Sequence, residues 1–207
     1  TFANGCPATF TAPAVTVNPL PVPTLLASTA SVCPNTNVTF TAGGGVSYIF
    51  KVNGSSVQSG VSNTYTTNIL TNGASVTVEA TNANGCKATS VPVIITVNAS
   101  PSGTLTTPSA TVCAASNVTF TATGGATYQF RVNGTIMQAF SAANTYTTST
   151  LVNASVVTVD VLSASGCPAT YPGLFMMVTP LPTGTLTATE NSGTSNDNII
   201  CPGLPVN

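Results

Sequence analysis

Apolar and polar residues alternate along much of this chain, so the hydrophobic period is two rather than 3.6. The alternation is clear in residues 38–42, 48–52 and 76–80. Such a period is typical of half-buried antiparallel strands, whose successive side chains point to opposite faces. In the first half of the chain it predicts strands near residues 24–28, 37–42, 47–53, 56–58, 64–67, 75–82 and 86–97.

Residue pairs suited to positive φ separate the expected strands. Asn53-Gly54 and Asn133-Gly134 have the two residues that a tight type I′ hairpin favours. Asn84-Gly85 and Ser165-Gly166 predict the same turn before the last strand of each unit. About seven short strands per unit, with no segment of helical period, predict an all-β fold of tandem immunoglobulin-like Greek-key β-sandwiches.

The pattern recurs after about 81 residues. Cys6, Cys86 and Cys167 each lie in a Gly-Cys-X-Ala-Thr motif, at steps of 80 and 81 residues. Cys33 and Cys113 each precede an Asn-Val-Thr-Phe-Thr-Ala motif. Self-similarity of this kind indicates consecutive copies of one structural unit.

The alignment of the repeats predicts four segments. Residues 1–20 would be the last strand of a preceding repeat, and residues 180–207 would be the start of a following one. Residues 21–98 and 99–179 would be two complete Ig-like repeats. We therefore expect the chain to be an excerpt from a longer tandem array.

Two cysteines fall within each complete repeat, and the alignment predicts that they pair there. Cys33 would bond Cys86, and Cys113 would bond Cys167. Each bridge would connect the segment before the second strand to the start of the last strand.

The other two cysteines, Cys6 and Cys201, would be half-disulfides with partners in adjacent repeats. Disulfides form in oxidising compartments, so they predict an exported protein. Paired thiolates binding zinc are the alternative, but such sites use closely spaced cysteines and often histidine, and the chain has no histidine. We expect no metal and no cofactor.

Comparison of the two repeats gives a role to most of the few charges. Lys51 aligns with Arg131, and Glu79 aligns with Asp160. All four would point outward on neighbouring strands, which predicts one structural ion pair per repeat, Lys51 with Glu79 and Arg131 with Asp160. An isopeptide cross-link from the lysine is disfavoured, because an arginine occupies the equivalent position.

The charge content excludes several function classes. The 207 residues include three Lys or Arg and four Asp or Glu, or 3% where about 25% is usual. With a net charge of −1, the chain lacks the basic face that binds nucleic acid. The mean hydropathy is +0.37, but apolar runs such as residues 174–178 are too short for membrane insertion. Without histidine, and with few carboxylates, the chain is not expected to be an enzyme.

Three further features of the sequence each allow two interpretations. The polar insert at residues 189–198 fits a solvated loop better than a calcium site. Asn-X-Ser/Thr sequons, such as that at Asn98, require no glycosylation in a chain so rich in these residues. Tyr65 and Tyr146 fit core or corner positions better than recognition positions.

These motifs resemble a known family. Units that end in Val-Thr-Val-Asn-Pro and contain Val-Thr-Phe-Thr-Ala, Val-Asn-Gly, Asn-Thr-Tyr-Thr-Thr and Asn-Gly-Cys are similar to the tandem Ig-like or PKD-like repeats of very large Bacteroidota cell-surface adhesins. The resemblance covers essentially the whole chain. It implies type IX secretion and display as long surface filaments, and it identifies no ligand.

The sequence thus favours a structural stalk segment of an extracellular, cell-surface adhesin filament that serves adhesion or gliding motility. Its partners would be neighbouring repeats of the same chain and an unknown surface or polysaccharide ligand. The alternative is a spacer or carbohydrate-binding module of a secreted multidomain enzyme. The absence of tryptophan disfavours sugar binding, which often uses exposed aromatic platforms.

Overall fold

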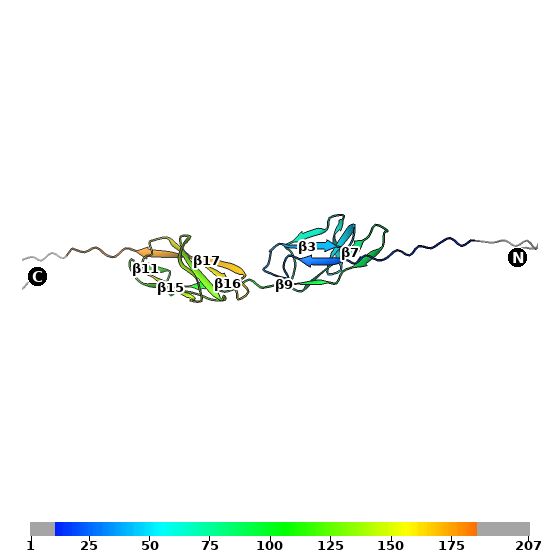
Figure 1. Cartoon of the computed structure of the whole chain (residues 1–207). Helices are drawn as coiled ribbons and strands as arrows, with labels where there is room; N and C mark the ends of the chain where they lie inside the picture. The colour runs from blue at the N-terminus through cyan, green and yellow to red at the C-terminus, as the bar shows by residue number, and fades with distance from the viewer. Residues whose placement is uncertain (1–10, 186–207) are drawn as a thin grey trace, which may run out of the picture.

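The protein forms two β-sandwiches that follow one another along the chain (Figure 1). The computed structural model describes residues 11–185, and the account below concerns these residues. All of the regular elements in this range are strands, so the predicted all-β fold class is confirmed. No described segment is a helix long and apolar enough to cross a membrane.

The first sandwich packs a three-stranded sheet against a larger one. The small sheet has the order β1 (Thr24–Ala27), β3 (Val38–Gly43), β6 (Thr64–Thr67). The large sheet has the order β2 (Ser31–Val32), β9 (Val93–Val97), β7 (Ala74–Thr81), β4 (Ser47–Val52), β5 (Ser55–Gly60), and β8 (Lys87–Thr89) also pairs with β7.

The second sandwich repeats this arrangement. Its small sheet has the order β10 (Leu105–Thr106), β12 (Val118–Ala122), β15 (Thr145–Thr148). Its large sheet has the order β11 (Thr111–Cys113), β17 (Pro168–Thr179), β16 (Ser155–Leu162), β13 (Thr127–Val132), β14 (Thr135–Ser141). In this copy one long strand, β17, takes the place of β8 and β9.

Each sandwich has its own hydrophobic core, built from the inward positions of the alternating strands. In the first, Phe40 and Phe50 are fully buried, and the Tyr65 ring lies 6.2 and 5.7 Å from theirs. The second core repeats this cluster with Phe120, Phe130 and Tyr146. The two tyrosines therefore contribute to the cores, as the sequence favours.

The hairpins at Asn53-Gly54 and Asn133-Gly134 have the predicted geometry. The φ angles are 50° and 82° in the first and 50° and 81° in the second. The prediction was wrong for the turns before the last strand, where only Gly85 and Gly166 have positive φ, at 81° and 79°. These turns are one residue longer, as the hydrogen bond from the Asn82 N–H to the Cys86 carbonyl shows.

One short strand of the first sandwich, β2, was missing from the prediction, and β11 is its counterpart in the second. β2 and β11 are only two and three residues long, too short to show a hydrophobic period. Each pairs in parallel with the end of the last strand, β2 with β9 and β11 with β17. This pairing carries the cysteine at the end of the short strand to the end of the sandwich where the chain leaves it.

Candidate functional site at the junction of the two sandwiches

Cys33 lies where the chain leaves the first sandwich. It directly follows β2, in which Val32 is paired with Val97 of the exit strand. The Asn98 N–H donates to the Val32 carbonyl at 2.8 Å, and the Asn98 side-chain amide donates to the Ser31 hydroxyl at 2.9 Å. These bonds hold the first residue of the connecting segment beside Cys33.

Cys167 lies at the near end of the second sandwich, in the turn between β16 and β17. The Ser163 N–H donates to the Cys167 carbonyl at 2.9 Å, and the Cys167 N–H donates to the Ser163 hydroxyl at 3.0 Å. The side chain of Cys167 is fully buried, and its Sγ lies 3.8 Å from the Asn98 carbonyl oxygen. Asn98 therefore touches both cysteine-bearing segments.

A disulfide joins Cys33 to Cys167 and so links the two sandwiches. The Cα atoms are 5.4 Å apart, and the cysteines are 134 residues apart in the sequence. The bond spans the connection between β9 and β10. The two sandwiches are thus held together by a covalent bridge as well as by the chain itself.

The predicted pairs, Cys33 with Cys86 and Cys113 with Cys167, were therefore wrong. Cys33 lies at the exit end of the first sandwich, whereas Cys86 lies in the turn at its entry end. The eight residues of β7 run from one end to the other, which places the two cysteines roughly 25 Å apart. A disulfide requires Cα atoms within about 7 Å. Cys113 and Cys167 are separated in the same way.

In the structure Cys86 and Cys113 are free thiols, with Cys86 half-buried and Cys113 exposed. Cys6 and Cys201, the two expected half-disulfides, lie outside the described residues. The insert at 189–198, for which a calcium site was one interpretation, also lies outside them.

Both ion pairs expected from the repeat alignment are present. Lys51 Nζ lies 2.8 Å from Glu79 Oε2, and Arg131 Nε lies 2.6 Å from Asp160 Oδ2. Each pair is diagonal across two antiparallel strands, since Lys51 faces Thr77 directly in the register of β4 and β7. Diagonal neighbours are within reach of long side chains.

Further partners around these pairs were not predicted. Lys87 Nζ lies 3.2 Å from Glu79 Oε1, and the Thr170 hydroxyl donates to Asp160 Oδ1 at 2.6 Å. Lys87 comes from β8 and Thr170 from β17, the strands that flank β7 and β16 on the other side. Only the strand order of the sheet brings them together, so the alignment of repeats gave no signal for them.

The ion pairs predict a small acid dependence of stability. Hydrogen bonds from Lys51 and Lys87 lower the pKa of Glu79. Burial raises the pKa of Asp160, but the hydrogen bonds from Thr170 and Arg131 outweigh it and the net pKa is lowered. A lowered carboxyl pKa adds stability above the unfolded-state value of about 4, and this stability is lost as pH falls through the folded-state value.

We therefore expect the melting temperature to be constant from about pH 5 to 8, since there is no histidine to titrate, and to fall by a few degrees below about pH 4. Circular dichroism melts across this range measure it. The Glu79→Gln, Asp160→Asn double variant should lose most of the acid-dependent fall. A large change between pH 5 and 8 would contradict this view.

The Lys51–Glu79 pair should contribute little to stability. Both side chains are partly exposed, so we expect a coupling of about 0.2–1 kcal/mol. Denaturant unfolding of Lys51→Met, Glu79→Gln and the double variant measures it as a double-mutant cycle. The same cycle at Arg131 and Asp160 is the matched control, and a coupling well above this range would show that the pairs do more than fix register.

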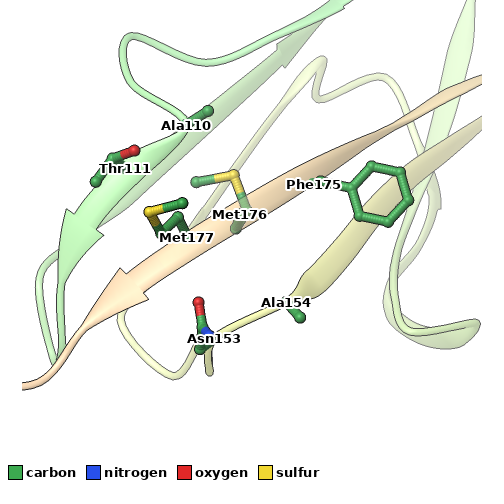
Figure 2. Close-up of a pocket in the computed structure, with 7 residues that line it drawn as sticks. All are labelled: Ala110, Thr111, Asn153, Ala154, Phe175, Met176 and Met177. Atoms are coloured by element: carbon green, nitrogen blue, oxygen red, sulfur yellow. The ribbon is translucent and has the colours of Figure 1, made fainter.

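The described surface also has a shallow apolar groove on the second sandwich. Figure 2 shows Met176 and Met177 of β17 beside Ala110 and Thr111 of the neighbouring segment. The groove has a volume of about 420 Å³, and none of its lining residues is charged. Among residues 11–185, no three His, Cys, Asp or Glu side chains gather as a metal site would require.

Comparisons with known proteins find similarity only to solved structures, at low sequence identity. No family model and no curated protein matches the chain. Solved structures that resemble it include the fibronectin(III)-like modules of Clostridium thermocellum CbhA, at 11% identity over 79% of this chain and 100% of that one, with a TM-score of 0.45. Another is murine CEACAM1b, at 13% identity over 76% of this chain and 100% of that one, with a TM-score of 0.38.

A third is the set of three N-terminal domains of the highly immunogenic outer capsid protein of bacteriophage RB49. It is 12% identical over 76% of this chain and 59% of that one, with a TM-score of 0.40. The class that the protein's own strand order defines is a tandem of immunoglobulin-like or fibronectin-III-like sandwiches.

Proposed function

We propose that the protein is a stalk segment of a long extracellular filament on a cell surface, built from tandem sandwiches and serving adhesion. The observation that carries this proposal is the Cys33–Cys167 disulfide, which crosses from one sandwich to the next. A bond within a sandwich would stabilise that unit only. A bond between two sandwiches restricts their relative movement, which is useful where reach and stiffness are the function.

The connection between the sandwiches supports the same role. β9 ends at Val97 and β10 begins at Leu105, and Pro101 lies in the short segment between them. Short connections that contain proline are stiffer than flexible Gly/Ser tethers. In Figure 1 the described ends of the chain leave at opposite ends of the pair, as they do in a rod.

The surface chemistry is compatible with an external location. Disulfides persist in oxidising compartments, and the chain relies on Ser, Thr and Asn rather than on charge for its polar surface. The resemblance of its motifs to repeats of Bacteroidota surface adhesins, among them the gliding-motility adhesin SprB, supports type IX secretion and a role in attachment or gliding. The far partner would be a surface or a polysaccharide.

Two measurements test the proposal. Small-angle X-ray scattering of the oxidised chain should give the profile of an elongated particle with the two sandwiches end to end. Immunogold labelling with antibodies against the chain should mark filaments outside the cells that produce it. A compact particle, or labelling confined to the cell interior, would overturn the proposal.

A binding assay separates the stalk from the alternative of a sugar-binding or spacer module in a secreted enzyme. The chain should not sediment with insoluble cellulose, chitin or xylan. Saturable sedimentation with one of them, lost on Phe175→Ala at the exposed edge of the groove, would favour the alternative.

A further inference from the structure

We propose that the two free thiols, Cys86 and Cys113, are halves of the same kind of disulfide that joins Cys33 to Cys167. Cys86 would bond the preceding repeat, and Cys113 would bond the following one. Every junction of the array would then have one peptide connection and one disulfide. This inference rests on the proposed tandem-array function and adds the chemistry of its junctions.

The surroundings of Cys86 match those of the bonded Cys167. Cys86 lies in the same turn, where the Asn82 N–H donates to its carbonyl at 3.0 Å and its own N–H donates to Asn82 Oδ1 at 3.0 Å. Its Sγ lies 3.9 Å from the Asn18 carbonyl oxygen. Asn18 stands in the Val-Thr-Val-Asn motif that corresponds to Ile-Thr-Val-Asn at Asn98, the residue whose carbonyl lies 3.8 Å from Cys167 Sγ.

The backbone of the preceding segment therefore contacts Cys86 as the connecting segment contacts Cys167 at the bonded junction. The Asn82 side-chain amide also donates to the Pro19 carbonyl at 2.9 Å, which fixes this backbone against the turn. At the bonded junction, Val32 pairs with Val97, and Cys33 directly follows Val32 as Asn98 follows Val97. A preceding repeat with the same short strand would place its own cysteine beside Asn18, close to Cys86.

The surroundings of Cys113 match those of the bonded Cys33. β11 pairs in parallel with the end of β17, with Val112 opposite Val178 and Cys113 opposite Thr179. In the first sandwich, Val32 is opposite Val97 in the same way. Cys113 is exposed at the exit end of its sandwich, where the turn of a following repeat would approach it.

Bond formation needs an oxidant, which thiol–disulfide exchange supplies. The Cys113 thiolate attacks a small disulfide such as oxidised glutathione and releases one glutathione thiol. The thiolate of the partner cysteine then attacks the mixed disulfide and releases the second. The two cysteine thiols lose two protons and two electrons, and one glutathione disulfide becomes two thiols.

A chain with one added repeat tests the proposal. A second copy of residues 99–179 is inserted after Thr179 of the full chain, and Cys6→Ser and Cys201→Ser remove the thiols outside the described residues. The chain is folded with a mixture of reduced and oxidised glutathione, and its disulfides are mapped by mass spectrometry. Cys113 should be linked to the copy of Cys167, with Cys33–Cys167 retained.

The thiol count gives a second, independent readout. Two thiols should remain per molecule, those of Cys86 and of the copied Cys113, and Cys113→Ser should raise the count to three by freeing the copy of Cys167. If Cys113 takes no partner, the parent has four thiols and Cys113→Ser lowers the count to three, which would overturn the inference.

Scattering from the same chain separates the inference from the proposed function. An elongated three-sandwich particle with an unpaired Cys113 would refute the inference of a disulfide at every junction but leave the stalk proposal intact. A compact particle would refute the stalk, whatever the thiol count. A disulfide between Cys113 and Cys167 would overturn the inference as well.

Discussion

When the oxidised chain is pulled by its two ends, roughly 480 Å of its contour length should stay locked. Cys33 and Cys167 are 134 residues apart, and an extended chain spans at most about 3.6 Å per residue. Once the sandwiches unfold, tension passes through the disulfide and bypasses everything between the two cysteines. Force spectroscopy should therefore show a final extension shorter by this amount than that of the same chain in dithiothreitol.

Two variants show which pairing provides the lock. Cys33→Ser with Cys167→Ser should give the long extension with or without reductant. Cys86→Ser with Cys113→Ser should leave the lock unchanged, because neither residue takes part in the observed bond. If instead this second variant abolished the lock, the bonds would lie within the repeats and the junction would have no covalent bridge.

The strands could be predicted because the alternation that marks each one lies within its own few residues. Alternation places each inward residue, and the expected strand at residues 47–53 differs from β4 (Ser47–Val52) by a single residue. The Lys51–Glu79 pair was predictable for a related reason. Each repeat has a basic residue and an acidic residue at the same two aligned positions, on strands that are neighbours in this fold. Few other partners are then left for either charge.

The disulfide could not be predicted from the same alignment. Cys86 and Cys167 occupy equivalent positions one repeat apart, so a bond from Cys33 to either is equally consistent with the periodic sequence. The choice depends on which end of the sandwich Cys33 reaches. That depends on β2, whose two residues have no detectable period and whose parallel partner is set by tertiary packing.

A single core substitution should separate the stabilities of the two sandwiches. Phe130 is fully buried in the second core, so Phe130→Ala removes an aromatic ring and leaves a cavity, at a cost of about 3–5 kcal/mol. The free energy of unfolding of a native protein is about 5–15 kcal/mol, so the second sandwich should lose a large part of its stability. The first sandwich, whose core residues form a separate cluster, should be almost unaffected.

Native-state hydrogen exchange with mass spectrometry reads the two units separately. Peptides from β12 and β13 should exchange much faster in Phe130→Ala, whereas those from β3 and β4 should not change. Phe50→Ala is the matched control and should give the mirror result, because Phe50 fills the same position in the first core. Equal acceleration in both sandwiches would show that the cores are coupled through the junction. Independent loss would mean that the disulfide joins two sandwiches that unfold separately.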